Sequence, residues 1–332
     1  MADPVSRQPS PRPLSMGWIV LGGAAYGVLM RLLFGMWPFV HGLTAGAGPM
    51  LVSFLFIVPL AIGFWSVARL PVERCTLARS IVLPWGPIAL FLFVAALLMI
   101  EGSICLVLAT PIFLAMASIG GLLGWVSMRF KPSRGSTHAV LVLPLLLGVV
   151  EQRAAIADEH GHSRQSVHVA ASPEHIWRLI NDARGIAPAE MAQGWAWRIG
   201  VPYPVSALTV EDGGARIRKL RWQKGVHFDE PILDWDENRY IRWSYRFTPD
   251  SIPPGALDEH VEVGGRYFDL LDTSYRLDPE GDGTRLTIEV NYRVSTHFNW
   301  YAVRLGDFLV DDAARTILDF YKRRTEADVG NG

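Results

Sequence analysis

The sequence predicts an α-helical transmembrane bundle of four or five spans, followed by an α+β domain with an antiparallel sheet and a long C-terminal helix. Half of the 332 residues are hydrophobic and the mean hydropathy is +0.21, which is high for a purely soluble protein. Charge is unevenly distributed, because residues 1–160 hold ten Lys/Arg and six Asp/Glu whereas the remainder holds 21 and 26. The last long stretch, residues 296–324, combines apolar and charged side chains at helical spacing.

The first 150 residues contain four apolar segments that meet the roughly 20-residue requirement of a membrane-spanning helix. Residues 1–15, with seven prolines or serines, are expected to form a disordered tail. The first span is too long for the core of a cleaved signal peptide. A fifth segment is marginal, because it is only about 13 residues long and contains Pro144. The transmembrane domain is predicted at 16–150, with spans at about 16–40, 49–68, 81–100, 104–128 and, marginally, 138–150.

Basic loops predict the orientation of the spans. The loops at 69–79 and 129–134 each carry three Lys/Arg, and the N-terminal tail is also basic. By the positive-inside rule these segments lie on the cytoplasmic side. The sequence thus indicates a multi-pass protein of a bacterial inner membrane with a cytoplasmic N-terminus. The C-terminal domain faces outward, to the periplasm, if the fifth segment crosses, and stays in the cytoplasm if it does not.

Arg31 is the one charged residue within the first span. It either contacts a lipid phosphate or substrate path, or it snorkels or pairs inside the bundle. Cys75 and Cys105 lie in different surroundings, so no disulfide framework is predicted. Residues 151–163 are expected to form a polar linker. Its His160 and His162 lack further ligands at suitable spacing, so no metal site is predicted.

The soluble domain is expected at 164–327, before a short tail at 328–332. Val167, Val169 and Ala171 alternate as a strand, and Ser172-Pro173-Glu174 then supplies a helix start. A short helical stretch follows near 186–192. The next segments alternate in the manner of strands, with glycine-containing turns at 212–214 and 280–283. These strands are predicted at about 205–211, 215–223, 226–235, 240–247, 266–277 and 285–294.

One face of this sheet should be apolar, as the last strand shows most clearly. The final helix, of about 25 residues, must then cover that face. Its predicted apolar face comprises Tyr301, Leu305, Phe308, Leu309, Ala313, Ile317 and Phe320. Its predicted polar face comprises Arg304, Asp307, Asp311, Arg315, Asp319 and Lys322.

The order of these elements, with the opening VHVAASPEHIWRLI, resembles the START-related (SRPBCC) superfamily, in the polyketide cyclase/dehydrase and lipid-transport group. The resemblance covers about residues 164–327 and does not extend to the membrane spans. It implies a helix-grip fold, in which a curved antiparallel sheet wraps around the C-terminal helix and leaves a cavity for an apolar ligand. Members include lipid carriers, cyclases, receptors and oxygenase subunits, so the resemblance implies fold more than chemistry.

Two polar segments are candidate sites. Asp258 and His260 precede Gly264-Gly265 and could act as general acid and base at a cavity mouth, or belong to a solvated loop. At the start of the long helix, His297 or Asn299 could orient a ligand head group beside the helix N-terminus. The alternative is that Thr296 or Asn299 is only the helix cap.

A third candidate is the lining of the sheet. Phe228 and Glu230 should point to the same side, as should Trp243, Tyr245 and Phe247 on the next strand. A carboxylate among aromatic rings would have a raised pKa, as catalytic acids and ligand anchors often do. The alternative is that Glu230 pairs with Arg242 or Arg246 at the sheet edge. Further residues that could join the ligand-binding surface are Tyr267, Asp269, Thr273, Tyr275, Tyr301 and Leu305.

These patterns favour a non-enzymatic, membrane-anchored protein that binds a lipid or another apolar small molecule. One alternative is a cyclase or dehydratase that uses Asp258 and His260. Another is an interaction or sensory module whose acidic face recruits a protein partner of unknown identity. No dinucleotide or phosphate-binding glycine motif is present, so no cofactor is predicted. No basic stripe with interleaved aromatic residues suggests nucleic-acid binding.

Overall fold

The computed structural model describes residues 15–41, 48–128, 134–151, 153–258 and 260–330. The chain forms two compact units. The N-terminal unit comprises residues 1–100 and 109–154, and the C-terminal unit comprises residues 101–108 and 155–332. The polar–apolar division expected from the sequence therefore corresponds to two separately packed parts, except that the short segment 101–108 belongs to the second.

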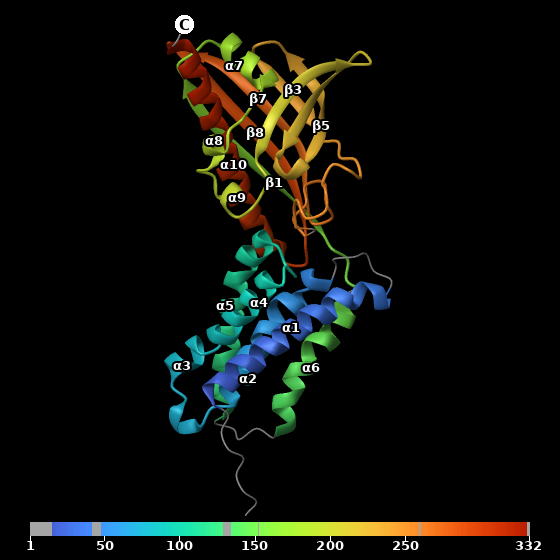
Figure 1. The fold of residues 1–332 in the computed structure, drawn as a ribbon, viewed down its shortest axis with the longest axis vertical. Helices are drawn as coiled ribbons and strands as arrows, with labels where there is room; N and C mark the ends of the chain where they lie inside the picture. Colours follow the sequence, from blue (N-terminus) through green and yellow to red (C-terminus); the bar gives the residue numbers. More distant parts are fainter. Residues whose placement is uncertain (1–14, 42–47, 129–133, 152, 259, 331–332) are drawn as a thin grey trace, which may run out of the picture. The chain divides into compact units, whose positions relative to one another are not determined.

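Among its described residues, every regular element of the N-terminal unit is a helix (Figure 1). Its regular elements are α1 (Met16–His41), the 3-10 turn η1 (Gly48–Met50), the π-helical η2 (Ser53–Ile57), α2 (Val58–Ala68), η3 (Val72–Arg74), α3 (Leu77–Val82), α4 (Trp85–Leu97), most of α5 (Ser103–Ser127) and α6 (Arg134–Glu151). The first six residues of α5 belong to the C-terminal unit.

Three helices are long and apolar enough to cross a membrane, by length and composition, within the described part of the chain. They are Met16–Met36, Leu77–Leu97 and Ser103–Ser127. The second predicted span is shorter as a helix, Ser53–Ala68, because a 3-10 turn and a bend replace regular helix at its start. The apolar part of the marginal fifth segment is also short, Ala139–Glu151.

Two charged side chains of this unit bond to its own backbone. Arg31 donates from Nη2 to the carbonyl of Ile100 at 3.3 Å, which supports the pairing interpretation over a free charge in the first span. Glu151, the last residue of α6, accepts hydrogen bonds from the backbone N–H groups of Val52 and Ser53 at 2.5 and 2.9 Å. Those N–H groups begin the η2–α2 helix and have no partner within it, so Glu151 caps that helix from a distant part of the chain.

The C-terminal unit contains one antiparallel sheet of eight strands in the order β1-β8-β7-β6-β5-β4-β3-β2 (Figure 1). Every neighbouring pair is antiparallel. The strands are β1 (Asp158–Val169), β2 (Asp182–Ala183), β3 (Pro204–Asp212), β4 (Ala215–Trp222), β5 (His227–Asp236), β6 (Tyr240–Ser244), β7 (Phe268–Glu280) and β8 (Gly283–Ser295).

The first strand begins earlier than the sequence suggests. β1 starts at Asp158, where it pairs with Ser295 of β8, so residues 158–163 belong to the sheet and not to the expected linker. The sequence hides this extension because most of its side chains are polar and exposed, and the pairing with β8 decides the structure. By contrast, the alternation predicted for β8 is confirmed, because all five residues of its apolar face are buried: Leu286, Ile288, Val290, Tyr292 and Val294.

Helices cover one face of the sheet. They are α7 (Pro173–Asn181), α8 (Pro188–Met191), α9 (Trp195–Arg198) and α10 (Asn299–Gly330), and a 3-10 turn, η5 (Gln223–Gly225), joins β4 to β5. Pro173 occupies the first position of α7, as predicted, although Ser172 makes no side-chain cap bond. Ile176, Trp177 and Ile180 of α7 are buried in the core beneath the sheet.

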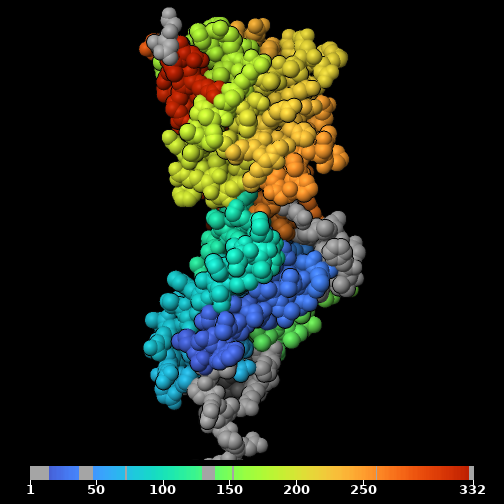
Figure 2. Space-filling view, viewed as in Figure 1, coloured from blue at the N-terminus to red at the C-terminus, as the bar shows by residue number. Residues whose placement is uncertain are grey.

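The long helix α10 is rotated relative to the face predicted from its sequence. Asp307 and Asp311, expected on the polar face, accept hydrogen bonds from the hydroxyls of Tyr292 on β8 and Ser163 on β1. Phe308, expected on the apolar face, is 49 % exposed. The buried tyrosine and serine hydroxyls explain the rotation, because each needs a polar partner on the helix. In space-filling view the yellow-green segment that contains α8 and α9 lies over part of α10 (Figure 2).

Candidate functional site

A buried ion pair connects two neighbouring strands of the sheet, β4 and β5. Arg218 on β4 and Glu230 on β5 are directly opposite in the strand register, and Nη1 of the arginine lies 2.5 Å from Oε2 of the glutamate. Only 5 % and 3 % of the two side chains are exposed. Charged side chains are almost never so deeply buried unless they are paired. The predicted pairing of Glu230 with Arg242 or Arg246 is therefore wrong.

Those two arginines have other partners. Arg242 bonds to Asp234 at 2.7 Å, and Arg246 bonds to Asp229 at 2.8 Å. Both pairs are substantially exposed. Because β5 alternates, Asp229 lies on the opposite face of the strand from Glu230. The outer arginines therefore neutralise outer aspartates, and the interior carboxylate takes the interior arginine.

Besides Glu230, three further groups contact the guanidinium of Arg218. Its Nη2 donates to the hydroxyl of Tyr321 on α10 at 3.1 Å, and its Nε donates to the carbonyl of Ile180 on α7 at 3.2 Å. Its Cζ lies 4.8 Å from the centre of the Trp243 ring on β6, a cation–π distance. Arg218 thus links two strands and two helices around one charge.

Burial and charge act in opposite directions on this pair. Desolvation in the interior raises the pKa of Glu230 to about 7, although the Arg218 charge and its hydrogen bond oppose the shift. Burial also disfavours the charge of Arg218, but the nearby Glu230 raises its pKa overall, so it stays protonated. A carboxyl group that titrates near neutral pH is thereby fixed against a permanent cation.

Aromatic rings continue from this pair along the inner face of the sheet. The ring of Trp222, at the end of β4, lies 6.0 Å from that of Trp197 on α9 and 5.3 Å from that of Phe228. Phe228 is in turn 5.9 Å from Tyr245 and 5.1 Å from Phe247. The predicted inward direction of Phe228, Tyr245 and Phe247 is thus confirmed, and the two tryptophans complete an aromatic surface.

Three indole N–H groups in this region are buried without a hydrogen-bond partner among the described residues. They belong to Trp197, Trp222 and Trp243. Trp243 is 2 % exposed, and its N–H lies close enough to Glu230 to lower the carboxyl pKa without forming a hydrogen bond of good geometry. A buried donor without an acceptor costs about 1–3 kcal/mol. The site therefore has a surplus of donors over acceptors.

The two halves of α10 pack differently. Its second half has buried side chains on every turn from Ala314 to Thr325, whereas no side chain between Asn299 and Ala313 is fully buried. Two predicted ligand-binding residues, Tyr301 and Leu305, are half-buried in the first half. The hydroxyl of Tyr301 donates to the carbonyl of Leu108 at 2.8 Å, which gives that residue a structural contact.

A β-bulge separates the residues predicted on β7. The register with β8 shifts between Leu270 and Asp272, which reverses the alternation on its N-terminal side. Tyr275 and Thr273 are buried on the inner side, where Thr273 bonds to the Tyr245 hydroxyl at 2.7 Å. Asp269 instead lies opposite Arg293, on the outer side, so its predicted place in the lining is wrong.

Tyr267 precedes this bulge and is buried against another residue. Its ring stacks on His260 with centroids 6.2 Å apart and an interplanar angle of 19°. The strand pattern alone could not place Tyr267, because it lies just before β7 and outside the regular alternation. Its predicted contact with a ligand stays a prediction.

Side-chain hydrogen bonds connect the residues at the start of α10, but none of them reaches a backbone N–H within the helix, so the capping interpretation stays a prediction. Asn299 accepts hydrogen bonds through Oδ1 from the backbone N–H and the hydroxyl of Thr296 at 2.7 and 2.9 Å. Its Nδ2 donates to the carbonyl of Ala157 at 2.8 Å. Asn299 therefore connects the residue just before β1 to the start of α10. His297, between Thr296 and Asn299 in the sequence, is half-buried.

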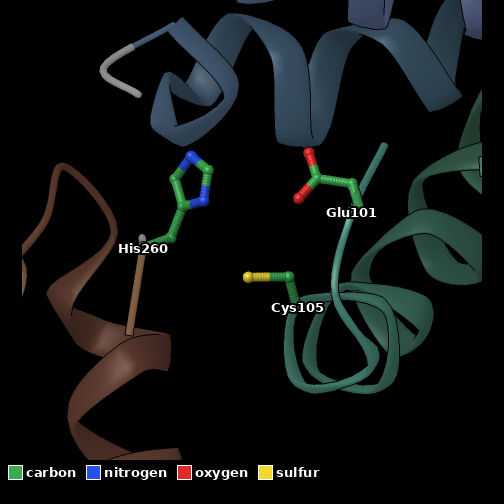
Figure 3. Close-up of side chains that lie close together, drawn as sticks. All are labelled: Glu101, Cys105 and His260. Carbon is green, nitrogen blue, oxygen red and sulfur yellow. The ribbon is translucent and has the colours of Figure 1, made fainter. Parts of the chain in front are cut away.

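Asp258 and His260 lie in the connection between β6 and β7, not on the strands that carry Glu230 and Trp243. Glu259, between them, lies outside the described residues. Asp258 accepts a hydrogen bond from the backbone N–H of Cys105 at 3.0 Å. His260 faces Glu101 and Cys105, and the potential ligand atoms of these three residues lie within 4.8 Å of one another (Figure 3). In the structure, His260 therefore lies beside Glu101 and Cys105, and Asp258, its predicted acid–base partner, bonds to the Cys105 backbone instead.

Sequence reasoning missed Arg218, Trp197 and Trp222. Arg218 shares its alternation with Leu220 and Trp222 on β4, and that apolar periodicity was the available signal that it points inward. Trp197 lies on α9, a single helical turn of four residues that no periodicity could reveal.

Comparison with known families agrees with this architecture. The family described as polyketide cyclase/dehydrase and lipid transport matches residues 160–326. Among solved structures, a protein from Thermus thermophilus is 18 % identical, covering 51 % of this chain and 99 % of its own, with a TM-score of 0.32. An aromatase/cyclase from a Streptomyces species is 14 % identical, covering 52 % and 96 %, with a TM-score of 0.32.

A norcoclaurine synthase of Thalictrum flavum is 13 % identical, covering 53 % of this chain and 99 % of its own, with a TM-score of 0.32. Comparison with curated proteins gave no significant match. The family match includes the whole sheet apart from the first two residues of β1, and most of α10. This chain belongs to the polyketide cyclase/dehydrase and lipid-transport family of the SRPBCC superfamily, and its C-terminal unit is a ligand-binding or cyclase-type domain.

Proposed function

We propose that the C-terminal unit binds a lipid or another apolar small molecule that carries oxygen acceptors, and that the N-terminal helices hold this unit at a membrane. The observation that carries the proposal is the donor-rich aromatic surface on the inner face of the sheet. Rings of Trp222, Phe228 and Tyr245 supply apolar contact area, and the buried indole N–H groups supply hydrogen-bond donors.

The chemistry of these groups indicates the class of ligand. Apolar chains bind such a surface through burial, at about 0.8 kcal/mol per methylene group. A carbonyl, ester or carboxyl oxygen could accept the unpartnered indole N–H groups and recover their desolvation cost. A pure hydrocarbon could not. The looser packing of the first half of α10 supports the proposal, because the apolar side chains there keep surface that a ligand can cover.

The membrane assignment rests on the helices of the N-terminal unit. Three of them are long and apolar enough to span. The elements η1, η2 and α2 together extend from Gly48 to Ala68, about the length of a further crossing if they act as one irregular helix. Four crossings would return the basic loop at 129–134 to the side of the basic N-terminal tail, as the positive-inside rule requires.

The donor role can be tested with a matched pair of probes. We would purify the full chain in detergent and measure binding of a pyrene-labelled fatty acid and of an alkylpyrene of equal length without the carboxyl group, subtracting the signal of empty micelles. Trp222→Phe and Trp243→Phe each remove an N–H and keep an aromatic ring. We expect each to weaken fatty-acid binding about three- to tenfold, equivalent to about 1 kcal/mol, and to leave alkylpyrene binding nearly unchanged.

Trp195→Phe is the control, because Trp195 is 52 % exposed on the neighbouring short helix. It should change neither affinity. Equal losses for both probes would show that the tryptophans contribute packing only. Failure of the wild-type chain to bind either probe, together with the absence of co-purified lipid in native mass spectrometry, would reject the proposed function.

A further inference from the structure

Glu101, Cys105 and His260 bring three different kinds of metal-ligating atom together outside the aromatic site. Their carboxylate oxygen, thiol sulfur and imidazole nitrogen lie within 4.8 Å of one another (Figure 3). Glu101 lies two residues before α5, Cys105 lies in the first turn of that helix, and His260 comes from the connection between β6 and β7. All three belong to the C-terminal unit, whose contacts include the segment 101–108.

The backbone around these side chains is fixed by several hydrogen bonds. The N–H of Cys105 donates to Asp258 Oδ2 at 3.0 Å, two residues before His260. The hydroxyl of Ser103 donates to the carbonyl of Ile199 at 2.8 Å. At the far end of the segment, Tyr301 donates to the carbonyl of Leu108 at 2.8 Å. The segment that carries Glu101 and Cys105 is therefore anchored to three separate parts of the domain.

His260 is also held in place. Only 7 % of its surface is exposed, and its ring stacks on Tyr267. Gly102 allows the close approach of the two segments, because a Cβ atom there would lie 1.3 Å from the Asp258 carboxylate. A site with fixed backbone and a ring fixed by stacking needs little ordering when an ion binds.

The three donor types select among metals. Mg²⁺ and Ca²⁺ take oxygen ligands, and a thiol among the donors disfavours both. Zn²⁺ accepts cysteine sulfur, histidine nitrogen and carboxylate oxygen, at about 2.3, 2.0 and 2.0–2.2 Å. In tetrahedral geometry such donors lie roughly 3.3–3.6 Å apart. The observed spacing needs to close by about 1 Å, which a rotation of the flexible Glu101 side chain can provide.

We propose that Glu101, Cys105 and His260 bind one zinc ion. Three protein ligands leave a fourth coordination position for water or an external donor. The ion joins the connection between β6 and β7 to the start of α5, two segments that are far apart in the sequence. The aspartate of this region contributes through Cys105: Asp258 accepts the Cys105 N–H and so positions the thiol without being a ligand.

Metal analysis of the full chain tests this proposal. The detergent-purified protein would be incubated with Zn²⁺, passed over a desalting column and measured by inductively coupled plasma mass spectrometry. We expect about one zinc per chain, and at least a tenfold weaker zinc affinity in Cys105→Ser and in His260→Ala. Glu101→Gln should lose less, because the amide oxygen is a poorer but still available ligand.

The chain supplies a matched control. Cys75 is the second of its two cysteines and lies outside the segment 101–108, so Cys75→Ser should keep the zinc. Replacing Zn²⁺ by Co²⁺ gives a readout of the sulfur ligand itself, namely a thiolate-to-metal charge-transfer band that Cys105→Ser abolishes and Cys75→Ser retains. Thermal unfolding without metal should be similar in both serine variants, which separates lost binding from misfolding.

Three outcomes would overturn the assignment: a wild-type chain that retains no zinc, equal loss of zinc in Cys75→Ser and Cys105→Ser, or a cobalt spectrum without the thiolate band.

Discussion

At the scale of single residues, the Arg218–Glu230 pair controls both the packing and the charge of the domain interior. Arg218 reaches β5, α7 and α10 with different nitrogen atoms, and Glu230 is the acceptor that neutralises it. Removing one member of such a pair leaves a buried charge without its partner and costs about 3–5 kcal/mol, whereas the intact pair adds little net stability. Its main effect is to fix one arrangement of strands and helices.

The raised pKa of Glu230 predicts a pH-dependent stability. Its value rises from 4.5 to about 7 on folding, mainly through desolvation, so between these pH values the folded chain binds more protons than the unfolded chain. The free energy of unfolding should therefore decrease as the pH rises from about 4.5 to about 7, by on the order of 3 kcal/mol, and level off above that range.

Glu230→Gln removes this titration and keeps the size of the side chain. We expect the melting temperature of the C-terminal unit, followed by tryptophan fluorescence between about pH 5 and 8, to lose the downward slope attributable to this group. Parallel profiles for wild type and variant would show that Glu230 is ionised throughout that range. Asp234→Asn, which alters the exposed pair with Arg242, is the control.

The partner of Glu230 shows what the sequence could and could not predict about the site. Strand alternation correctly directed Phe228 and Glu230 inward, because neighbouring side chains along a strand point to opposite faces. The same rule applied to β4 would place Arg218 with Leu220 and Trp222 on the inner face, but the sequence analysis missed this residue. Which arginine pairs with Glu230 depends on the register between β4 and β5, and local sequence does not encode a register that η5 and the rest of the sheet determine.

At the scale of elements, close packing around Tyr292 fixes α10 against the sheet. A Cβ atom at Gly161 on β1 would lie 2.1 Å from the Tyr292 ring, and one at Gly306 on α10 would lie 3.0 Å from it. The tyrosine hydroxyl then donates to Asp307. The two glycines make room for a large ring between a strand and a helix.

Gly161→Ala should therefore destabilise the C-terminal unit by about 1–3 kcal/mol, because the ring must move to admit the methyl group. The melting temperature of the full chain in detergent measures the effect. Ser166→Ala, at an exposed position of the same strand, should stay within about 0.5 kcal/mol of wild type. An unchanged melting temperature in Gly161→Ala would contradict the packing described for Tyr292.

The cap formed by Glu151 gives an element-scale prediction for the N-terminal unit. Glu151→Gln keeps an acceptor but removes the negative charge from the positive end of the η2–α2 helix. We expect the free energy of unfolding of this unit to fall by about 0.5–2 kcal/mol. The measurement is the temperature at which the detergent-purified chain aggregates on heating, which should be lower in the variant. Glu73→Gln in the exposed η3 turn should have no comparable effect.

Element positions were easier to predict than element orientations. Turn glycines and alternation located most strands within a few residues, and length and hydropathy located the long helices. The rotation of α10 and the bulge in β7 were not predictable in this way. The Tyr292 and Ser163 hydroxyls draw aspartates toward the sheet, and the bulge reverses the alternation of Asp269. Both are tertiary effects that outweigh the local pattern.

At the scale of the whole molecule, the proposed topology predicts opposite exposure of two loops of the N-terminal unit. In a cysteine-free chain, Glu73→Cys lies in the basic loop before α3 and Met99→Cys lies after α4. A membrane-impermeant maleimide should label Glu73→Cys only from the cytoplasmic side and Met99→Cys only from the other side. Labelling of both from one side would show that the segment Leu77–Leu97 does not cross the membrane.

A single cysteine at a third position would show on which side of the membrane the C-terminal unit lies. Asp282 lies in the turn between β7 and β8, with 94 % of its side chain exposed. Because the segment 101–108 follows Met99 and belongs to the C-terminal unit, Asp282→Cys should be labelled from the same side as Met99→Cys, which requires α6 to cross. Labelling of Asp282→Cys from the cytoplasmic side alone would contradict this topology. The sequence predicted the division into an apolar and a mixed half, because hydropathy and charge are summed over long windows. It did not predict that Glu101 and Cys105 lie close to His260. These residues are far apart along the chain, and no periodic pattern in the sequence indicates which distant segments meet.

The place where the chain enters the sheet has a mechanical consequence. β1 begins at Asp158, which pairs with Ser295, the last residue of β8. The start of β1 and the end of β8 therefore lie at the same end of the β1–β8 ladder, just before α10. Tension on the segment before β1 would therefore separate β1 from β8 one residue pair at a time, starting at the first pair. An antiparallel pair of strands resists this sequential separation weakly, because only one pair bears the load at any moment. Ser295 and Asn299, which bond to Asp158 and to the carbonyl of Ala157, form the latch that must rupture first.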